Sequence, residues 1–164
     1  MSNGVANGMG EALARIPSGV SILTATYGDR STGMLASWIQ QASFRPPMIS
    51  VCVKRGRPIL GLITPSQCFC LNVVGEGDSS LMKHFGSGFS IDDDAFTGLN
   101  IEGGPFGVLL RDAIAHLQCS SWSPASAKWW KGRFAGQTRP MFICAKQAWP
   151  IDALQDDPER RCFA

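Results

Sequence analysis

The 164-residue sequence has no long apolar run, no excess of one charge and no cysteine pair with C-x-x-C spacing. No stretch approaches the roughly 20 apolar residues that span a bilayer, and the first ten residues lack the regions of a signal peptide. We therefore expect a soluble, cytoplasmic protein without a membrane partner. The 15 basic and 13 acidic residues leave a net charge of +2. This balance lacks the electrostatic footprint of a nucleic-acid-binding protein.

Neither the cysteines nor the clustered acidic residues predict a metal site. Cys68 and Cys70 would point to opposite faces of an extended strand, so they favour neither a zinc site nor a disulfide framework. Buried free thiols are the simpler interpretation for the six cysteines. Asp92, Asp93 and Asp94 are consecutive, and carboxylates on a loop in this arrangement usually form a solvated surface.

The hydrophobic pattern predicts one mainly β domain with short helices. A β-branched run over 20–27, the turn residues Gly28 and Asp29, and an apolar segment over 33–42 predict an antiparallel hairpin. Long helices do not alternate with the strands, and Gly86-Ser-Gly88 lacks the third glycine of a dinucleotide fingerprint. The pattern therefore favours an antiparallel barrel over a Rossmann fold. Further strands are predicted at 48–54, 68–74 and 108–119, and short helices at 11–16, 59–63 and 81–85.

The segment from Gly33 to Pro47, with the strand that follows it and Lys54-Arg-Gly-Arg-Pro58, carries the most information. It resembles the flavin reductase-like family, in which a strand of small and hydroxyl residues, a Ser-x-x-Pro-Pro corner and another strand follow in this order. The resemblance covers about residues 11–119. It extends to flavoredoxin-like proteins and to the C-terminal flavin reductase module of flavodiiron proteins in photosynthetic microbes. It implies an antiparallel FMN-binding split β-barrel with short connecting helices, assembled as a homodimer with the flavin near the subunit interface.

The residues of this segment suit a flavin phosphate and ring. Small side chains at 34–37 let backbone N–H groups approach an anion, and Ser37 can donate a hydroxyl hydrogen bond. Lys54 and Arg57 bracket a glycine and would converge on one phosphate. Trp38 offers a flat face, although a tryptophan among apolar residues is also a common core residue.

The cofactor contacts of the family transfer to individual positions of this sequence. Arg57 is open to a second interpretation as an exposed loop residue, and Asn72 to one as the cap of a strand bulge. The implied FMN-binding residues are Met34, Leu35, Ala36, Ser37, Trp38, Gln41, Ser43, Lys54, Arg57 and Asn72.

The resemblance implies an FMN-binding oxidoreductase with NADH or NADPH as the electron donor. It would be an NAD(P)H:flavin reductase or a flavoredoxin-type electron carrier that works with a redox protein partner. The alternative is a non-catalytic flavin-binding or interaction module derived from a larger electron-transfer protein. No catalytic residue is assigned, because a flavin performs the redox step itself. His84 and His116 are interpreted as surface or hydrogen-bonded residues.

The segment 120–164 departs from the family pattern, which would continue with a Gly-Asp-His element and a further strand. Four of the five tryptophans lie in this segment. A diverged extension, a partner-binding tail and a shifted reading frame all remain open, and loss of the normal sequence, including by frameshift, is favoured. We expect a split barrel over 11–119 and an atypical, poorly ordered segment over 120–164. Segments 142–145 and 106–110 are the candidates to replace the missing strand.

Overall fold

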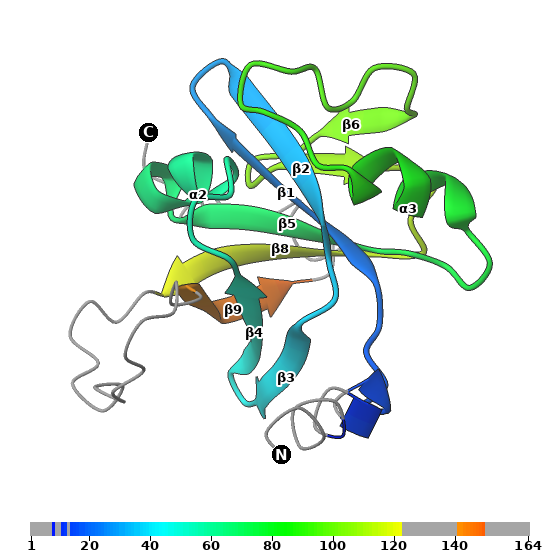
Figure 1. Cartoon of the computed structure of the whole chain (residues 1–164). Helices are drawn as coiled ribbons and strands as arrows, with labels where there is room; N and C mark the ends of the chain where they lie inside the picture. Colours follow the sequence, from blue (N-terminus) through cyan, green and yellow to red (C-terminus); the bar gives the residue numbers. More distant parts are fainter. Residues whose placement is uncertain (1–7, 9–10, 13, 123–140, 150–164) are drawn as a thin grey trace.

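The computed structural model describes residues 8, 11–12, 14–122 and 141–149 (Figure 1). Within them, a seven-stranded sheet has the order β2-β1-β5-β8-β9-β4-β3, and β6 and β7 form a separate pair. Every strand pair is antiparallel. The elements are β1 Ser21–Tyr27, β2 Arg30–Ala36, β3 Ile39–Phe44, β4 Pro47–Val53, α2 Leu60–Ser66, β5 Cys68–Val73, α3 Ser79–Gly86, β6 Ile101–Gly103, β7 Val108–Leu110, β8 Ala115–Trp122 and β9 Met141–Trp149.

The predicted hairpin is confirmed as β1 and β2. The two strands pair from Ser21 with Ala36 to Tyr27 with Arg30. Gly28 turns the chain between them with a φ of 63°, which glycine adopts without the steric penalty of a side chain. The mainly β, antiparallel architecture with short helices agrees with the expectation from the sequence.

Apolar residues cover both faces of β1, because successive side chains of a strand point to opposite faces. Leu23 and Ala25 belong to a core cluster with residues of the 59–63 segment. Ile22 belongs to a second cluster that contains Leu81 and Phe85 of α3. Figure 1 accordingly shows α2 and α3 on opposite sides of the β1–β2 hairpin. The hairpin is therefore packed between two apolar layers.

Strand β9 lies between β8 and β4 and pairs with both. It contains the segment 142–145 that the sequence offered as a substitute strand, whereas Val108–Leu110 pairs with β6 in the smaller sheet. The predicted boundary at Cys119 falls inside β8. Residues 123–140 and 150–164 lie outside the described residues, so the predicted character of 120–164 stays a prediction.

The expectation that the cysteines are all free thiols is wrong for one of them. Cys52, Cys70 and Cys119 are free thiols, whereas Cys68 is disulfide-bonded. Burial raises the pKa of the Cys70 thiol to about 12, although a hydrogen bond with Thr24 lowers it in part. Burial also raises the pKa of Cys119.

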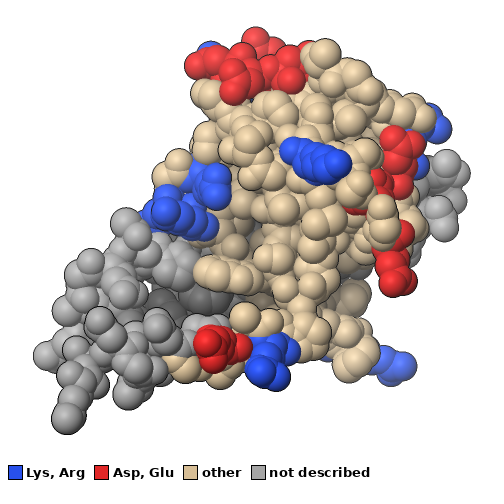
Figure 2. Space-filling view, turned by 45° about the vertical axis from the view of Figure 1, so that its right-hand side comes forward, with Lys and Arg blue, Asp and Glu red and all other residues tan. Residues whose placement is uncertain are grey.

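The consecutive aspartates have separate partners. Asp92 pairs with Arg30 at 3.2 Å, Asp93 accepts a hydrogen bond from the Ser90 N–H, and Asp94 accepts one from the Thr97 hydroxyl. They line an open hollow together with Asp29, and Figure 2 shows acidic side chains gathered at one end of the molecule. No helix among the described residues is long and apolar enough to cross a membrane.

Candidate functional site

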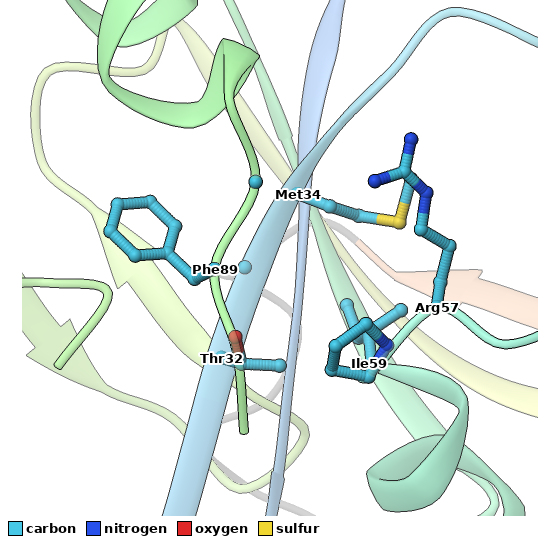
Figure 3. Close-up of a pocket in the computed structure, with 8 residues that line it drawn as sticks. Thr32, Met34, Arg57, Ile59 and Phe89 are labelled. Carbon is cyan, nitrogen blue, oxygen red and sulfur yellow. The ribbon is translucent and has the colours of Figure 1, made fainter. Parts of the chain in front are cut away.

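A small hollow lies between β2, the connection from β4 to α2, and the loop after α3 (Figure 3). Its empty space, including the open mouth, is about 210 Å³. The hollow is therefore a shallow depression that cannot enclose a flavin. The lining residues are Thr32, Gly33, Met34, Arg57, Pro58, Ile59, Gly88 and Phe89.

Two residues that the sequence assigned to the cofactor, Met34 and Arg57, meet at this hollow. Figure 3 shows the Met34 side chain extending from β2 toward the Arg57 guanidinium. Arg57 is exposed, and no ion pair of its side chain is found among the described residues. Its Nη1 lies beside Gly88, where an added Cβ would be 3.4 Å away. Arg57 therefore offers an unpaired cation at the rim.

Thr32, Gly88 and Phe89 are site residues that the sequence did not identify. Thr32 lies two positions before Met34 on β2, so strand alternation could have placed both on one face. Gly88 and Phe89 come from a loop far along the chain, and no local pattern links them to β2. The ring of Phe89 packs against the ring of His84, with the two centroids 5.1 Å apart. The Nε2 of His84 is 2.9 Å from the carbonyl oxygen of Ala95.

The predicted residues next to Met34 do not line the hollow. Leu35 points to the opposite face and packs against the cluster that contains α3, and Ala36 is buried in the first cluster. Ser37 and Trp38 form the connection between β2 and β3. The Trp38 side chain is 68% exposed, so it is a surface residue in this chain and not a core residue.

The remaining predicted residues lie away from the hollow. Gln41 and Ser43 are on the edge strand β3, where the pairing with β4 shifts register between them. Lys54 is exposed at the end of β4, and its carbonyl oxygen accepts a hydrogen bond from the Arg57 N–H at 3.3 Å. Lys54 and Arg57 are neighbours in this turn, but only Arg57 lines the hollow. Their contacts with a cofactor stay predictions.

Asn72 lies on the opposite face of the sheet from the hollow. It is fully buried in β5. Its Oδ1 accepts a hydrogen bond from the Leu110 N–H at 2.9 Å, and its Nδ2 is 3.2 Å from the carbonyl oxygens of Ile22 and Val108. The side chain therefore fastens the β6–β7 pair to the main sheet. The second histidine, His116, is also hydrogen-bonded, with Nε2 at 2.7 Å from the Leu110 carbonyl oxygen.

Comparison with known proteins gives three findings. The flavin reductase like domain family matches residues 13–139. Diflavin flavoprotein A 1 of Synechocystis is 40% identical over 111 residues, which cover 66% of this chain and 19% of the relative. The chain thus spans about a fifth of the length of the curated relatives that it matches.

Solved structures provide the third finding. The NADH:FAD oxidoreductase SgcE6 of Streptomyces globisporus superposes with a TM-score of 0.69 at 20% identity and covers 93% of this chain and 87% of that one. Flavoredoxin from Methanosarcina acetivorans gives a TM-score of 0.61 at 15% identity, with 82% and 69% covered. These likenesses confirm the split-barrel fold.

Proposed function

Because the chain belongs to the flavin reductase-like family, we propose that it binds FMN non-covalently and passes electrons from NADH or NADPH through the bound flavin. In this proposal it works as an NAD(P)H:flavin reductase or as an electron carrier of the flavoredoxin type. The observation that supports it most directly is the meeting of Met34 and Arg57 at one hollow. A bound flavin supplies hydride acceptance and electron transfer.

The chain's own residues would hold and orient the cofactor. Lys54 is exposed and has no ion pair among the described residues, so its ammonium is available to a phosphate. Ser37 adds a hydroxyl donor close to the end of β2. Met34 is half-buried and offers an adaptable apolar contact. Trp38 presents an exposed ring that can lie against the flavin.

We further propose that the protein works as a homodimer whose second copy covers part of the flavin. The hollow of one chain is too small to enclose the cofactor. Trp38, directly before the edge strand β3, and Phe44, at the end of that strand, are 68% and 82% exposed. Exposed aromatic side chains at a sheet edge favour burial by a partner. A mass measurement in solution that gives a monomer with tightly bound FMN would contradict this proposal.

A second candidate function is a non-catalytic flavin-binding or interaction module of a larger electron-transfer protein. It is favoured by the match to only about a fifth of the diflavin relatives. The two functions differ in their response to NADH and NADPH. Bound FMN that is reduced by NADH, by NADPH or by a protein donor supports the first function, whereas bound FMN that none of these donors reduces supports a non-catalytic module.

Replacement of Lys54 tests the phosphate contact. We expect Lys54→Ala to weaken FMN binding by about 1 to 3 kcal/mol, because a charge-assisted hydrogen bond is lost. Riboflavin lacks the phosphate, so its affinity should not change. Fluorescence titration measures both ligands, and Arg55→Ala in the same turn is the matched control. Equal weakening of FMN and riboflavin would show that Lys54 does not contact the phosphate, and a wild-type protein that binds no flavin would refute the proposed function.

A further inference from the structure

We propose that His84 is a positioning residue for the candidate site, because its side chain fastens the segment 87–95 against α3 and so holds Gly88 and Phe89 beside the hollow. The inference rests on the proposed function in one respect, which is that a flavin binds next to this hollow. His84 does not itself line the hollow. It acts through the segment that it fastens.

The His84 side chain contacts the segment 87–95 at two places. Its Nε2 is 2.9 Å from the carbonyl oxygen of Ala95, at the far end of the segment. Its ring centroid lies 5.1 Å from that of Phe89, near the start. Among the described residues, no other side chain outside the segment forms a hydrogen bond with the segment's main chain. One residue of α3 therefore joins both parts of the segment to the helix.

The hydrogen bond to Ala95 is an anchor in the interior of the fold. A carbonyl oxygen only accepts hydrogen bonds, so the Nε2 of His84 carries the hydrogen and donates it. Ala95 is fully buried. A buried carbonyl that loses its donor cannot readily replace it with water, which makes the loss costly. Removal of the imidazole therefore favours a shift of the segment.

The aromatic rings around His84 hold Phe89 in the same way. The buried Phe85 lies edge-on to His84 at 4.8 Å and to Phe89 at 5.7 Å. Figure 3 shows the Phe89 ring pointing away from Met34 and Arg57, while its main chain runs beside β2. The ring is thus the fixed end of Phe89, and the main chain is the part that borders the hollow.

The position of this main chain limits the space at the rim of the hollow. Gly88 lies so close to Arg57 that an added Cβ would be 3.4 Å from the Nη1 of Arg57. A displacement of the segment by less than the width of an atom would therefore change the room left for the Arg57 side chain. His84 accordingly controls the geometry of a site that it does not touch.

Two variants and one matched control test this role in the full chain. His84→Leu removes both the donor and the aromatic ring, and His84→Gln keeps an N–H donor without the ring. His116→Leu is the control, because the Nε2 of His116 makes the same kind of bond, at 2.7 Å from the Leu110 carbonyl oxygen, and His116 does not line the hollow. We expect His84→Leu and His116→Leu each to lower the melting temperature by about 2 to 8 °C.

Amide hydrogen exchange measures the fastening directly. We expect exchange over residues 87–95 to be about threefold to tenfold faster in His84→Leu than in the wild type, because the anchors of the segment are lost. His84→Gln should recover part of the protection. His116→Leu should leave this segment unchanged. Unchanged exchange over 87–95 in a folded His84→Leu protein would refute the fastening.

Flavin titration then measures the effect on the site. We expect His84→Leu to weaken FMN and riboflavin by the same factor, about threefold to tenfold, because the wall of the site moves and no phosphate contact is removed. The absorption band of the bound flavin should shift, His84→Gln should restore part of the affinity, and His116→Leu should match the wild type.

The remaining outcomes separate this inference from the proposed function. Faster exchange over 87–95 with unchanged flavin affinity and absorption would refute the positioning role while flavin binding stands. Equal weakening in His84→Leu and His116→Leu would refute it as well, because the loss would then follow general stability. A wild type that binds no flavin would refute the proposed function, and the exchange experiment would still decide whether His84 fastens the segment. If His84→Leu does not fold, His84→Gln and the matched His116→Gln provide the same comparisons.

Discussion

Asn72 should contribute to stability because it connects three strands. The Nδ2 group has two hydrogens, so it can donate to at most two of its three neighbours at one time, which are the Ile22 and Val108 carbonyl oxygens and the Thr24 hydroxyl. The Oδ1 accepts the Leu110 N–H at 2.9 Å. All of these groups lie in the interior of the fold, where water cannot replace a lost partner.

Asn72→Leu keeps most of the volume and removes the hydrogen bonds. The Val108 carbonyl keeps the Thr24 hydroxyl, at 2.6 Å, but the Leu110 N–H loses its acceptor. An orphaned buried N–H costs about 1 to 3 kcal/mol, and the lost bond to Ile22 adds about 0.5 to 1.5 kcal/mol. We therefore expect the free energy of unfolding to fall by about 2 to 4 kcal/mol.

Denaturant unfolding measures this loss as a lower midpoint at an unchanged slope. Amide hydrogen exchange localises it, because the Leu110 N–H should lose protection in the variant while β4 keeps its own. A double-mutant cycle with Thr24→Val should show a coupling of about 0.5 kcal/mol or more, since the two side chains share partners. A loss below about 0.5 kcal/mol would refute the reasoning that the β6–β7 pair is fastened through Asn72.

The same variant tests the family-derived role of Asn72 at the flavin. Because the side chain lies on the face opposite the hollow, the folded variant should keep its affinity for FMN. A folded Asn72→Leu protein with much weaker FMN binding would instead support direct contact with the cofactor.

Three further predictions concern packing, thiols and pH. Gly33→Ala should destabilise the fold by about 1 to 3 kcal/mol, measured by denaturant unfolding, because its Cβ would lie 2.7 Å from a ring carbon of the buried Phe85. Cys70, whose pKa burial raises to about 12, should react with a thiol reagent only after unfolding, and the half-buried Cys52 should react first. Hydrogen bonds lower the pKa of Asp78 at the start of α3, and the largest effect comes from the Ser80 side chain. Asp78 therefore stabilises the fold above its pKa in the unfolded chain, and this stabilisation is lost as pH falls through its pKa in the folded chain. The difference in stability between the wild type and Asp78→Ala should shrink in acid.

The sequence by itself determined the features that depend on near neighbours along the chain. Alternation of apolar residues predicts strands, and Gly28 with Asp29 predicts the turn between β1 and β2. The segment from Gly33 to Pro47 was sufficient to identify the family. These signals lie within short continuous stretches of the chain, so they need no information about the rest of the fold.

Only the tertiary structure decided which distant residues meet. It brings Gly88 and Phe89 to the same hollow as Thr32 and Arg57, because the loop after α3 lies beside β2. It places β9 between β8 and β4, whereas the sequence offered 142–145 only as one of two candidates for the missing strand. It also turns Asn72 away from the hollow, because the β5 register places that residue opposite Ile22. Strand order and register depend on pairing between segments far apart in the chain, and such pairing leaves no signal in local composition.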